Sequence, residues 1–237
     1  MKSLLWRIVP SLLQTRLRQL KADLLDIYST KSYAQEGEDM ILRRIFEKKG
    51  DGFYVDIGAH HPKRFSNTHY FYRLGWSGIN IDATPGRMAC FNKVRPRDIN
   101  LEIAIASGHR ELTLFLFNEP ALNSFDEALA RRRNVGHYRI IGEQKMGTRT
   151  LAETLAAHLP AGQAIDFLSL DVEGLDMDVL QSNDWQRFRP EYILTECLAA
   201  NLQELTQSPV YQLLDENGYD FFAKTVHTVM FKARPHD

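Results

Sequence analysis

Three short apolar stretches of the chain each end in acidic residues, and these acids are the first candidates for chemistry. The first stretch begins at Phe53 and ends in Asp56, Gly58 and Ala59. Small residues at the end of a buried strand let a ligand approach the backbone, and open α/β sheets bind their ligands at this edge. The stretch therefore indicates a ligand site, although an ordinary turn from a strand into a loop would use the same residues.

The other two stretches repeat this pattern. Asp82 ends the second one, 26 positions after Asp56. Dinucleotide-binding folds place the acid that accepts both hydrogen bonds of a ribose diol at a similar spacing, about 20 residues. Asp171 ends the third stretch and is followed by Glu173. Because the carboxyl ends of parallel strands meet at one edge of a sheet, the three stretches predict one shared site.

Five spaced motifs resemble those of the FkbM family of S-adenosylmethionine-dependent methyltransferases. They are, in order, YAQEGED (33–39), DIGAHHP (56–62), SNT (66–68), GWSGINID (75–82) and LDVEG (170–174). The resemblance extends from about residue 32 to the C-terminus. It has one departure, because many methyltransferases have a further glycine after the Gly-Ala pair, where this chain has His60 and His61. The Gly-x-Gly-x-x-Gly motif of NAD-binding domains is absent, which argues against a dehydrogenase.

The fold that this resemblance implies is α/β. We expect a Rossmann-like class I methyltransferase, with a mostly parallel central sheet, helices on both faces and an antiparallel closing strand. The alternation of strand-like and helical patterns along the chain favours the same arrangement. We expect two parts, an N-terminal amphipathic helical extension over residues 1–30 and an FkbM-like methyltransferase domain over residues 31–237. The total of 237 residues suits one α/β domain.

The cofactor that the resemblance implies is S-adenosyl-L-methionine. By this resemblance, Asp56 and the backbone of Gly58 and Ala59 lie by its methionine end, Asp82 holds its ribose, and Asp171 lies near its amino-acid or methyl end. Three carboxylates that face one cation are electrostatically favourable. The alternative is that these acids only cap helices and turns.

Four further residues are candidate cofactor neighbours by the same resemblance. Gln35 and Glu38 belong to the entry segment ahead of the first strand, which in the family helps to close the pocket. Ala104 and Ile105 lie at the end of a third strand predicted over residues 101–106, where folds of this order flank the adenine ring. Helix capping and solvation explain Gln35 and Glu38 equally well.

A proton acceptor is the remaining chemical requirement, because the positive sulfonium of the cofactor already activates the methyl group. His60, His61 and Glu173 are the candidate catalytic bases, and His227 near the last strand is another. A histidine in such a loop is more often a polar contact than a base. No metal is expected, because the acids between residues 171 and 176 could hold a divalent cation but lack a distinctive ligand pattern.

The expected activity is methyl transfer to a hydroxyl oxygen, and the resemblance favours a small-molecule acceptor that is a sugar or is linked to a glycan. Two alternatives stay open, which are N-methylation of an amine or a protein side chain, and a non-catalytic nucleoside-binding module. A basic segment over residues 118–148 fits a lid that recognises an acidic or phosphate-bearing acceptor. A solvated helix face is the other interpretation of that segment.

Composition and charge limit the partners and the location. A net charge of −1 gives no general attraction to nucleic acid. Cys90 and Cys197 lack metal-ligand spacing and suit the reducing cytoplasm, and no apolar run approaches the about 18 residues of a membrane span. Residues 1–30 combine basic side chains with leucines at helical spacing. This pattern predicts a helix that lies peripherally on the anionic inner membrane surface, or packs on its own domain or on a second copy in a homo-oligomer.

Overall fold

The structure is a computed structural model that describes residues 10–25 and 28–235. The chain divides into two compact units, Met1–Ser32 and Tyr33–Asp237. All the candidate site residues belong to the second unit.

The first unit contains the helix α1 (Ser11–Leu25). Its side chains include exposed leucines, which are Leu12, Leu13, Leu17, Leu20, Leu24 and Leu25. Residues 1–9 and 26–27, which complete the predicted extension, lie outside the described residues. The contact that we predict with a membrane, with its own domain or with a second copy therefore stays a prediction. In the part of the chain that the structure describes, no helix is both long and apolar enough to cross a bilayer.

The second unit is built on a seven-stranded sheet in the order β3-β2-β1-β7-β8-β10-β9. Its strands are β1 (Phe53–Ile57), β2 (Ser77–Ile81), β3 (Ile99–Leu101), β7 (Phe167–Leu170), β8 (Tyr192–Glu196), β9 (Tyr219–Lys224) and β10 (Thr228–Ala233). The first five strands of the order are parallel, and β10 runs antiparallel to both β8 and β9. The predicted fold class, a mostly parallel Rossmann-like sheet with an antiparallel closing strand, is confirmed.

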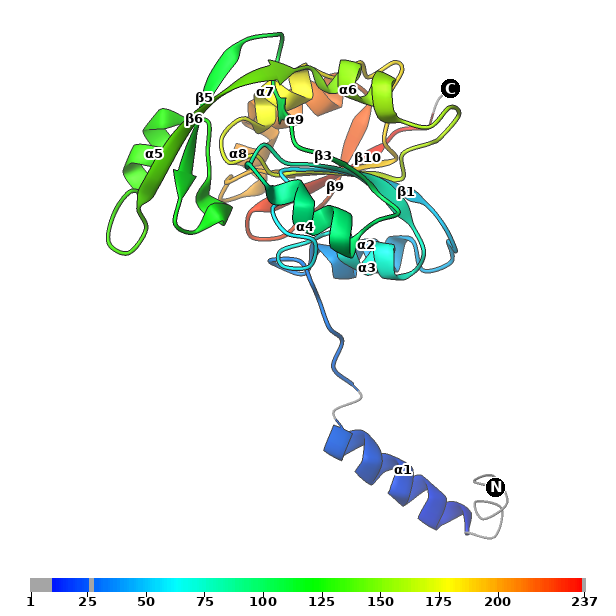
Figure 1. The fold of residues 1–237 in the computed structure, drawn as a ribbon. Coiled ribbons are helices and arrows are strands. Elements are labelled where there is room, and N and C mark those ends of the chain that lie inside the picture. Colours follow the sequence, from blue (N-terminus) through cyan, green and yellow to red (C-terminus); the bar gives the residue numbers. More distant parts are fainter. Residues whose placement is uncertain (1–9, 26–27, 236–237) are drawn as a thin grey trace. The chain divides into compact units, whose positions relative to one another are not determined.

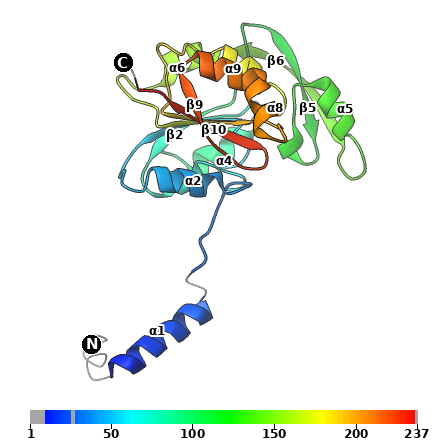
Figure 2. The ribbon, with the colours of Figure 1, turned by 180° about the vertical axis from the view of Figure 1, so that it is seen from behind.

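Helices cover both faces of this sheet, as the sequence predicts (Figure 1). On one face lie α2 (Glu38–Ile45), α3 (His69–Arg73) and α4 (Arg87–Val94), and on the other α6 (Leu151–His158), α7 (Asp176–Gln181), α8 (Leu202–Gln207) and α9 (Pro209–Glu216). The view from behind shows α6, α8 and α9 above the sheet and α2 and α4 below it (Figure 2). The parallel strands are mainly apolar because both faces of the sheet are covered, and all five residues of β1, Asp56 included, are buried.

Two separate apolar clusters form on the two faces. Aromatic side chains dominate the first cluster, where Phe46 at the end of α2 packs on Phe71, Trp76 and Phe167. Aliphatic side chains dominate the second cluster, to which α6, α7, α8 and α9 all contribute. The sheet is thus held rigidly between two packed layers, and this fixes where its strand ends lie.

A smaller sheet projects from one end of the central sheet (Figures 1 and 2). It has the order β4-β6-β5, with β4 (Ala104–Ile105), β5 (Glu111–Phe117) and β6 (Ile140–Arg149). Between β5 and β6 lie the short 3₁₀ helix η2 (Pro120–Leu122) and the helix α5 (Glu127–Arg133). We call residues 111–149 the arm.

The arm differs from the sequence-based expectation in two ways. The third strand predicted over residues 101–106 is divided, because β3 joins the central sheet and β4 joins the small one. The segment over residues 118–148, interpreted from the sequence as a basic lid or a solvated helix face, contains most of the ten-residue strand β6, paired antiparallel with β5. Most of β6 is exposed or only partly buried, so the strand lacks the alternating apolar pattern that would reveal it.

Candidate functional site

A cavity of about 360 Å³ lies at the carboxyl ends of β1, β2, β4 and β7. Its wall brings together most of the residues proposed from the sequence: Gln35, Asp56, Gly58, His60, Asp82, Ala104, Ile105, Asp171 and Glu173. The arm supplies a further part of the wall, which includes residues 119–123. The three acid-ending strands therefore do converge on one cavity.

Asp82 is held in place by the backbone at the end of β2. Its Oδ2 accepts a hydrogen bond from the backbone N–H of His60 (2.8 Å), and its Oδ1 accepts one from Thr84 (2.7 Å). Each carboxylate oxygen can accept a second hydrogen bond, so the group retains acceptor capacity for two ligand hydroxyls. His60 has a φ of 49°, in the left-handed region. It thus adopts the conformation that glycine usually supplies, at the place where many methyltransferases have a further glycine.

Gly58 is required by a close contact between two strand ends. Its φ is +78°, and a Cβ at this position would lie 1.7 Å from the backbone carbonyl oxygen of Asp171. The N–H groups of Gly58 and Ala59 both donate to the carbonyl of Ile81 (2.9 and 3.0 Å). The end of β1 therefore contacts the ends of both neighbouring strands, and any side chain larger than hydrogen would separate β1 from β7.

Ala59 and Glu38 are placed differently from the other proposed cofactor neighbours. The side chain of Ala59 is buried against Met88 and Phe91 of α4. Glu38 is also buried, and its carboxylate accepts hydrogen bonds from the backbone N–H of Glu36 (2.9 Å) and the hydroxyl of Thr228 (3.0 Å). Glu38 therefore fixes the entry segment against β10. Ala104 and Ile105 are buried and form an apolar part of the cavity wall.

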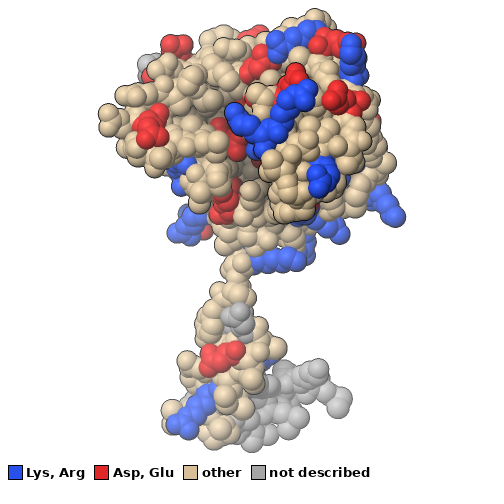
Figure 3. Space-filling model, turned by 90° about the vertical axis from the view of Figure 1, so that its left-hand side faces the viewer, with Lys and Arg blue, Asp and Glu red and all other residues tan. Residues whose placement is uncertain are grey.

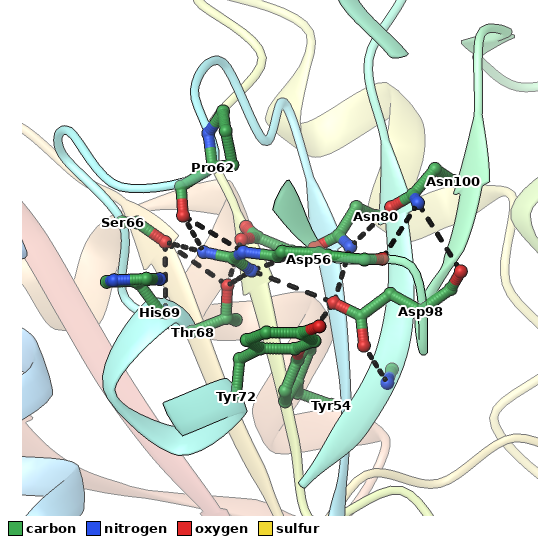
Figure 4. A network of polar contacts seen from close by, with 12 residues as sticks. Tyr54, Asp56, Pro62, Ser66, Thr68, His69, Tyr72, Asn80, Asp98 and Asn100 are labelled. Atoms are coloured by element: carbon green, nitrogen blue, oxygen red, sulfur yellow. Dashed lines mark hydrogen bonds and ion pairs between the residues drawn. The ribbon is translucent and has the colours of Figure 1, made fainter. Parts of the chain in front are cut away.

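Asp56 is buried, and it belongs to a polar network behind the cavity (Figure 4). Its Oδ2 accepts a hydrogen bond from the hydroxyl of Thr68 (2.7 Å). Burial raises the pKa of Asp56, while the hydrogen bond from Thr68 and the charge of Arg95 oppose this rise. The network thus determines the orientation and the charge of an acid that also reaches the cavity wall.

Arg95 is the centre of this network and has no exposed surface. Its guanidinium donates to the carbonyl of Pro62 (2.6 and 2.9 Å) and to the hydroxyls of Ser66 and Thr68 (both 2.7 Å). Asp98 lies 3.9 Å from the same guanidinium. The sequence gives no signal for this role, because nothing in it distinguishes Arg95 from Arg97, which lies two positions later and is exposed.

The two adjacent histidines differ in their surroundings. His60 lines the cavity, and burial, followed by the charge of Arg87, lowers its pKa to about 4. His61 is outside the lining, and its Nδ1 accepts hydrogen bonds from the backbone N–H groups of Lys63 (3.1 Å) and Arg64 (3.0 Å). Burial, and then Arg87, lower the pKa of His61 as well. Both imidazoles are thus biased toward the neutral form.

A second cavity of about 350 Å³ adjoins the first. The residues that line both cavities are Gln35, Phe65, Asn67, Leu122, Asp171 and Glu173. The acids in the second wall are Glu36, Glu38, Asp171, Glu173 and Glu196, and the basic groups are Arg133 and His227. Two cavities of similar size therefore meet at Asp171 and Glu173.

Both basic groups of the second cavity are engaged by acids. Arg133 of α5 binds Glu173 through a 2.5 Å ion pair, and His227 binds Glu36 through its side chain and its backbone N–H. Burial acts to raise the pKa of Glu36, but the hydrogen bonds from His227 and Thr225 lower it to about 2. Glu36 and Arg133 were not proposed from the sequence, although Glu36 lies between Gln35 and Glu38 in the entry segment.

The arm and the loop after β7 are tied to each other. The hydroxyl of Ser124 donates to the carbonyl of Glu173 (2.6 Å), and a Cβ on Gly174 would lie 3.1 Å from the side chain of Asp126. Basic residues elsewhere in the arm pair with nearby acids, as Arg131 does with Glu127 and Lys145 with Glu111. Figure 3 shows charges of both signs interspersed on this side of the molecule. Of the arm's basic residues, Arg133 is the one that lines the second cavity.

Comparison with known proteins gives the family. A model of the methyltransferase FkbM domain matches residues 56–221, which is more than half of the chain. The protein belongs to the FkbM methyltransferase family. The resemblance seen in the spaced motifs is thereby confirmed, and the cofactor of this FkbM protein is S-adenosylmethionine.

Solved methyltransferase structures resemble the chain at low identity. The precorrin-6Y C5,15-methyltransferase of Geobacter metallireducens is 12% identical with a TM-score of 0.44, covering 86% of this chain and 93% of its own. An O-methyltransferase of Bacillus cereus, in complex with SAH, is 10% identical with a TM-score of 0.42 (96% and 93% covered). A TehB-like S-adenosylmethionine-dependent methyltransferase of Corynebacterium glutamicum is 9% identical with a TM-score of 0.42 (94% and 99% covered). No curated protein matches the chain in sequence.

The residues of this FkbM protein fit the cofactor in three respects. Gly58 lines the cavity without a side chain, the anchored carboxylate of Asp82 retains acceptor capacity for a ribose diol, and Ala104 and Ile105 offer an apolar wall. When bound, the cofactor supplies a methyl group that its positive sulfonium already activates. The protein has to bind it, orient it and receive a proton from the acceptor.

We expect Asp82→Ala, which removes the acceptor for both ribose hydroxyls, to weaken the binding of S-adenosylhomocysteine by at least about 100-fold. The reason is that hydrogen bonds to a charged group contribute about 1.5–3 kcal/mol each. Isothermal titration calorimetry measures the change. Asp82→Asn keeps one acceptor oxygen, which can serve the N–H of His60 or that of Thr84 but not both, and it should lose less than Asp82→Ala. The exposed Asp51→Asn serves as the control. Unchanged affinity in folded Asp82→Ala would show that the ribose lies elsewhere.

Proposed function

We propose that this FkbM protein transfers a methyl group from S-adenosylmethionine to a hydroxyl of a sugar or of another glycan-linked small molecule. The observation that supports the proposal is the shared wall of the two cavities, formed in part by Asp171 and Glu173. The first cavity holds the donor and the second holds the acceptor. At about 350 Å³, the second cavity lies within the range of about 300–1,000 Å³ of small-molecule sites.

The second cavity suits a polyol because its polar groups are mainly hydrogen-bond acceptors. The carboxylates of its wall, with the amide oxygen of Asn67, can accept hydrogen bonds from several hydroxyls. Arg133 and His227 supply donors for the ring and hydroxyl oxygens of a sugar. A negatively charged wall does not favour an acidic or phosphate-bearing acceptor. The basic residues of the arm suggest such an acceptor from the sequence alone.

N-methylation of an amine is a second candidate, because the same acidic wall would attract a protonated amino group. Five carboxylates line the second cavity against one guanidinium and one imidazole. Such an amine would have to lose a proton before it could accept a methyl group, and a carboxylate of the wall could take that proton.

An acceptor screen with methyl-labelled S-adenosylmethionine distinguishes these functions. The acceptors are neutral methyl glycosides, amino sugars whose amine is free or acetylated, and a lysine-containing peptide. We expect label on the neutral glycosides and on the acetylated amino sugars. Transfer confined to free amines would establish the second candidate. Tight binding of S-adenosylhomocysteine without transfer to any acceptor in the panel would count against both and favour the non-catalytic nucleoside-binding module.

A further inference from the structure

Three carboxylates from two neighbouring strand ends meet between the two cavities. Leu170 of β7 pairs with Thr195 of β8 in parallel register, so the residues that follow, Asp171 and Glu196, lie side by side at the sheet edge. Glu173 lies in the loop after β7. Each of the three acids places one carboxylate oxygen within 4.8 Å of the others. We call Asp171, Glu173 and Glu196 the carboxylate cluster.

The positive charges that face the carboxylate cluster are too few to neutralise it. Arg133 from α5 pairs with Glu173, and His227 from the turn between β9 and β10 pairs with Glu36. In the described part of the chain, Asp171 and Glu196 form no ion pair with a basic residue. Like charges this close cannot all ionise at little cost, so neighbouring carboxylates in such an arrangement share a proton.

A fourth acid behind the cluster adds to the negative field. Asp176, in the first turn of α7, is 7% exposed, and its Oδ1 has no hydrogen-bond partner among the described residues. Burial, and then the charge of Glu196, raise the pKa of Asp176 to about 7. Asp171 borders the open cavity, yet surrounding protein atoms desolvate its carboxylate. This desolvation, followed by Glu173 and Asp176, raises the pKa of Asp171. Burial and Glu173 raise the pKa of Glu196.

We propose that the carboxylate cluster holds one proton in the unliganded protein, that the positive charge of the bound methyl donor displaces this proton, and that Glu196 then accepts the proton of the acceptor hydroxyl. The proposal rests on the function proposed above. The carboxylate cluster lies between the two cavities. Asp171 and Glu173 line both of them, and Glu196 lines the second cavity, which we propose holds the acceptor. Glu196 is therefore a base that is available only when the donor is bound.

The proton and the electrons balance over one turnover. The bond between the methyl carbon and sulfur breaks and its electron pair stays on sulfur, while a bond forms between the methyl carbon and the acceptor oxygen. The proton of that hydroxyl passes to Glu196. Because the sulfur no longer carries a positive charge, the carboxylate cluster again favours the protonated state in which it began.

Calorimetry tests this inference without any acceptor. S-adenosylmethionine and S-adenosylhomocysteine differ in the sulfonium charge, so the full-length protein is titrated with each at pH 6.5, below the pKa of about 7.7–8.0 of an α-amino group. Buffers of different ionisation enthalpy give the number of protons released. We expect S-adenosylmethionine to release more protons than S-adenosylhomocysteine, by an amount on the order of one.

Glu196→Gln is the decisive variant, and Glu191→Gln, an exposed glutamate just before β8, is the matched control. We expect Glu196→Gln to bind both ligands within about threefold of the parent and to lose at least half of the difference in proton release. With an acceptor identified, its kcat should fall by about 10²–10⁴-fold and the acidic limb of the pH profile should shift. The Glu191→Gln protein should match the parent in both measurements.

Three results would overturn the proposal. Equal proton release by the two ligands would refute the shared proton. The proposed function would still stand if hydroxyl acceptors are methylated. An unchanged kcat in Glu196→Gln would show that Glu196 is not the base. Stoichiometric binding of Mg²⁺ by the unliganded protein, lost in Glu196→Gln, would make the carboxylate cluster a metal site. Conversely, a normal proton difference without any methylated acceptor would refute the proposed function alone.

Discussion

Replacing Gly58 by alanine is expected to lower the free energy of unfolding by about 2–5 kcal/mol. A left-handed backbone costs an alanine about 1–2 kcal/mol, and overpacking of a close contact adds about 1–3 kcal/mol. Here the added Cβ would lie 1.7 Å from the carbonyl oxygen of Asp171, so β1 and β7 would have to separate at the cofactor cavity. Urea unfolding followed by circular dichroism measures the loss, and we expect binding of S-adenosylhomocysteine to fall with it.

Gly86→Ala is the matched control for this experiment. Gly86 has a φ of +74°, nearly that of Gly58, but a Cβ at this position would meet no atom within 4 Å. We therefore expect this variant to lose only the conformational cost of about 1–2 kcal/mol and to bind S-adenosylhomocysteine normally. Equal losses in the two variants would contradict the importance of the contact between Gly58 and Asp171.

The second large effect is expected for Arg95→Met, which should destabilise the protein by about 3–5 kcal/mol. Removing one partner of a buried ion pair leaves the other charge without compensation. Asp98 would lose the guanidinium, and Pro62, Ser66 and Thr68 would lose a hydrogen-bond donor. Guanidinium chloride unfolding measures the change, and the exposed Arg97→Met is the control. Arg95→Lys, which keeps the charge but not the planar fork, should lie between the two.

The pH dependence of Arg95→Met follows from two buried acids. Burial raises the pKa values of Asp56 and Asp98 in the folded protein, and the charge of Arg95 opposes both rises. Without Arg95 both folded-state pKa values rise further above their unfolded values. A raised carboxyl pKa costs stability as the pH increases from the unfolded value to the folded one. The variant should therefore be less destabilised near pH 5 than at pH 8, and an equal loss at both would contradict this origin.

The sequence predicts those features of the site that depend on strand ends. Asp56, Asp82 and Asp171 could be found because each follows an apolar run, and parallel strands bring such ends to one edge. The contact between Asp171 and Glu196 could not be found in this way. It depends on β8 being the neighbour of β7, and in the sequence alone Glu196 is one more acid at the end of an apolar run.

Contacts made by buried side chains from distant segments were also beyond the sequence. Arg95 follows α4 as one basic residue among several, and only the fold shows that its guanidinium is fully enclosed. Arg133 belongs to a run of three arginines, of which only the third pairs with Glu173. Burial and pairing of this kind depend on tertiary packing, which leaves no periodic pattern in the chain.

Under the proposed function, the arm holds one residue, Arg133, that can change the choice of acceptor without lining the donor cavity. The arm lies in the chain between β4 and α6, and its strands β5 and β6 belong to the small sheet, so it can vary while the order of the seven central strands is kept. Asp56, Asp82 and Asp171 of the first cavity lie at strand ends of the central sheet, and residues 119–123 of the arm complete its wall. Arg133 reaches only the second cavity. If the second cavity holds the acceptor, as proposed, substitutions at Arg133 would change substrate preference and leave the wall of the first cavity intact.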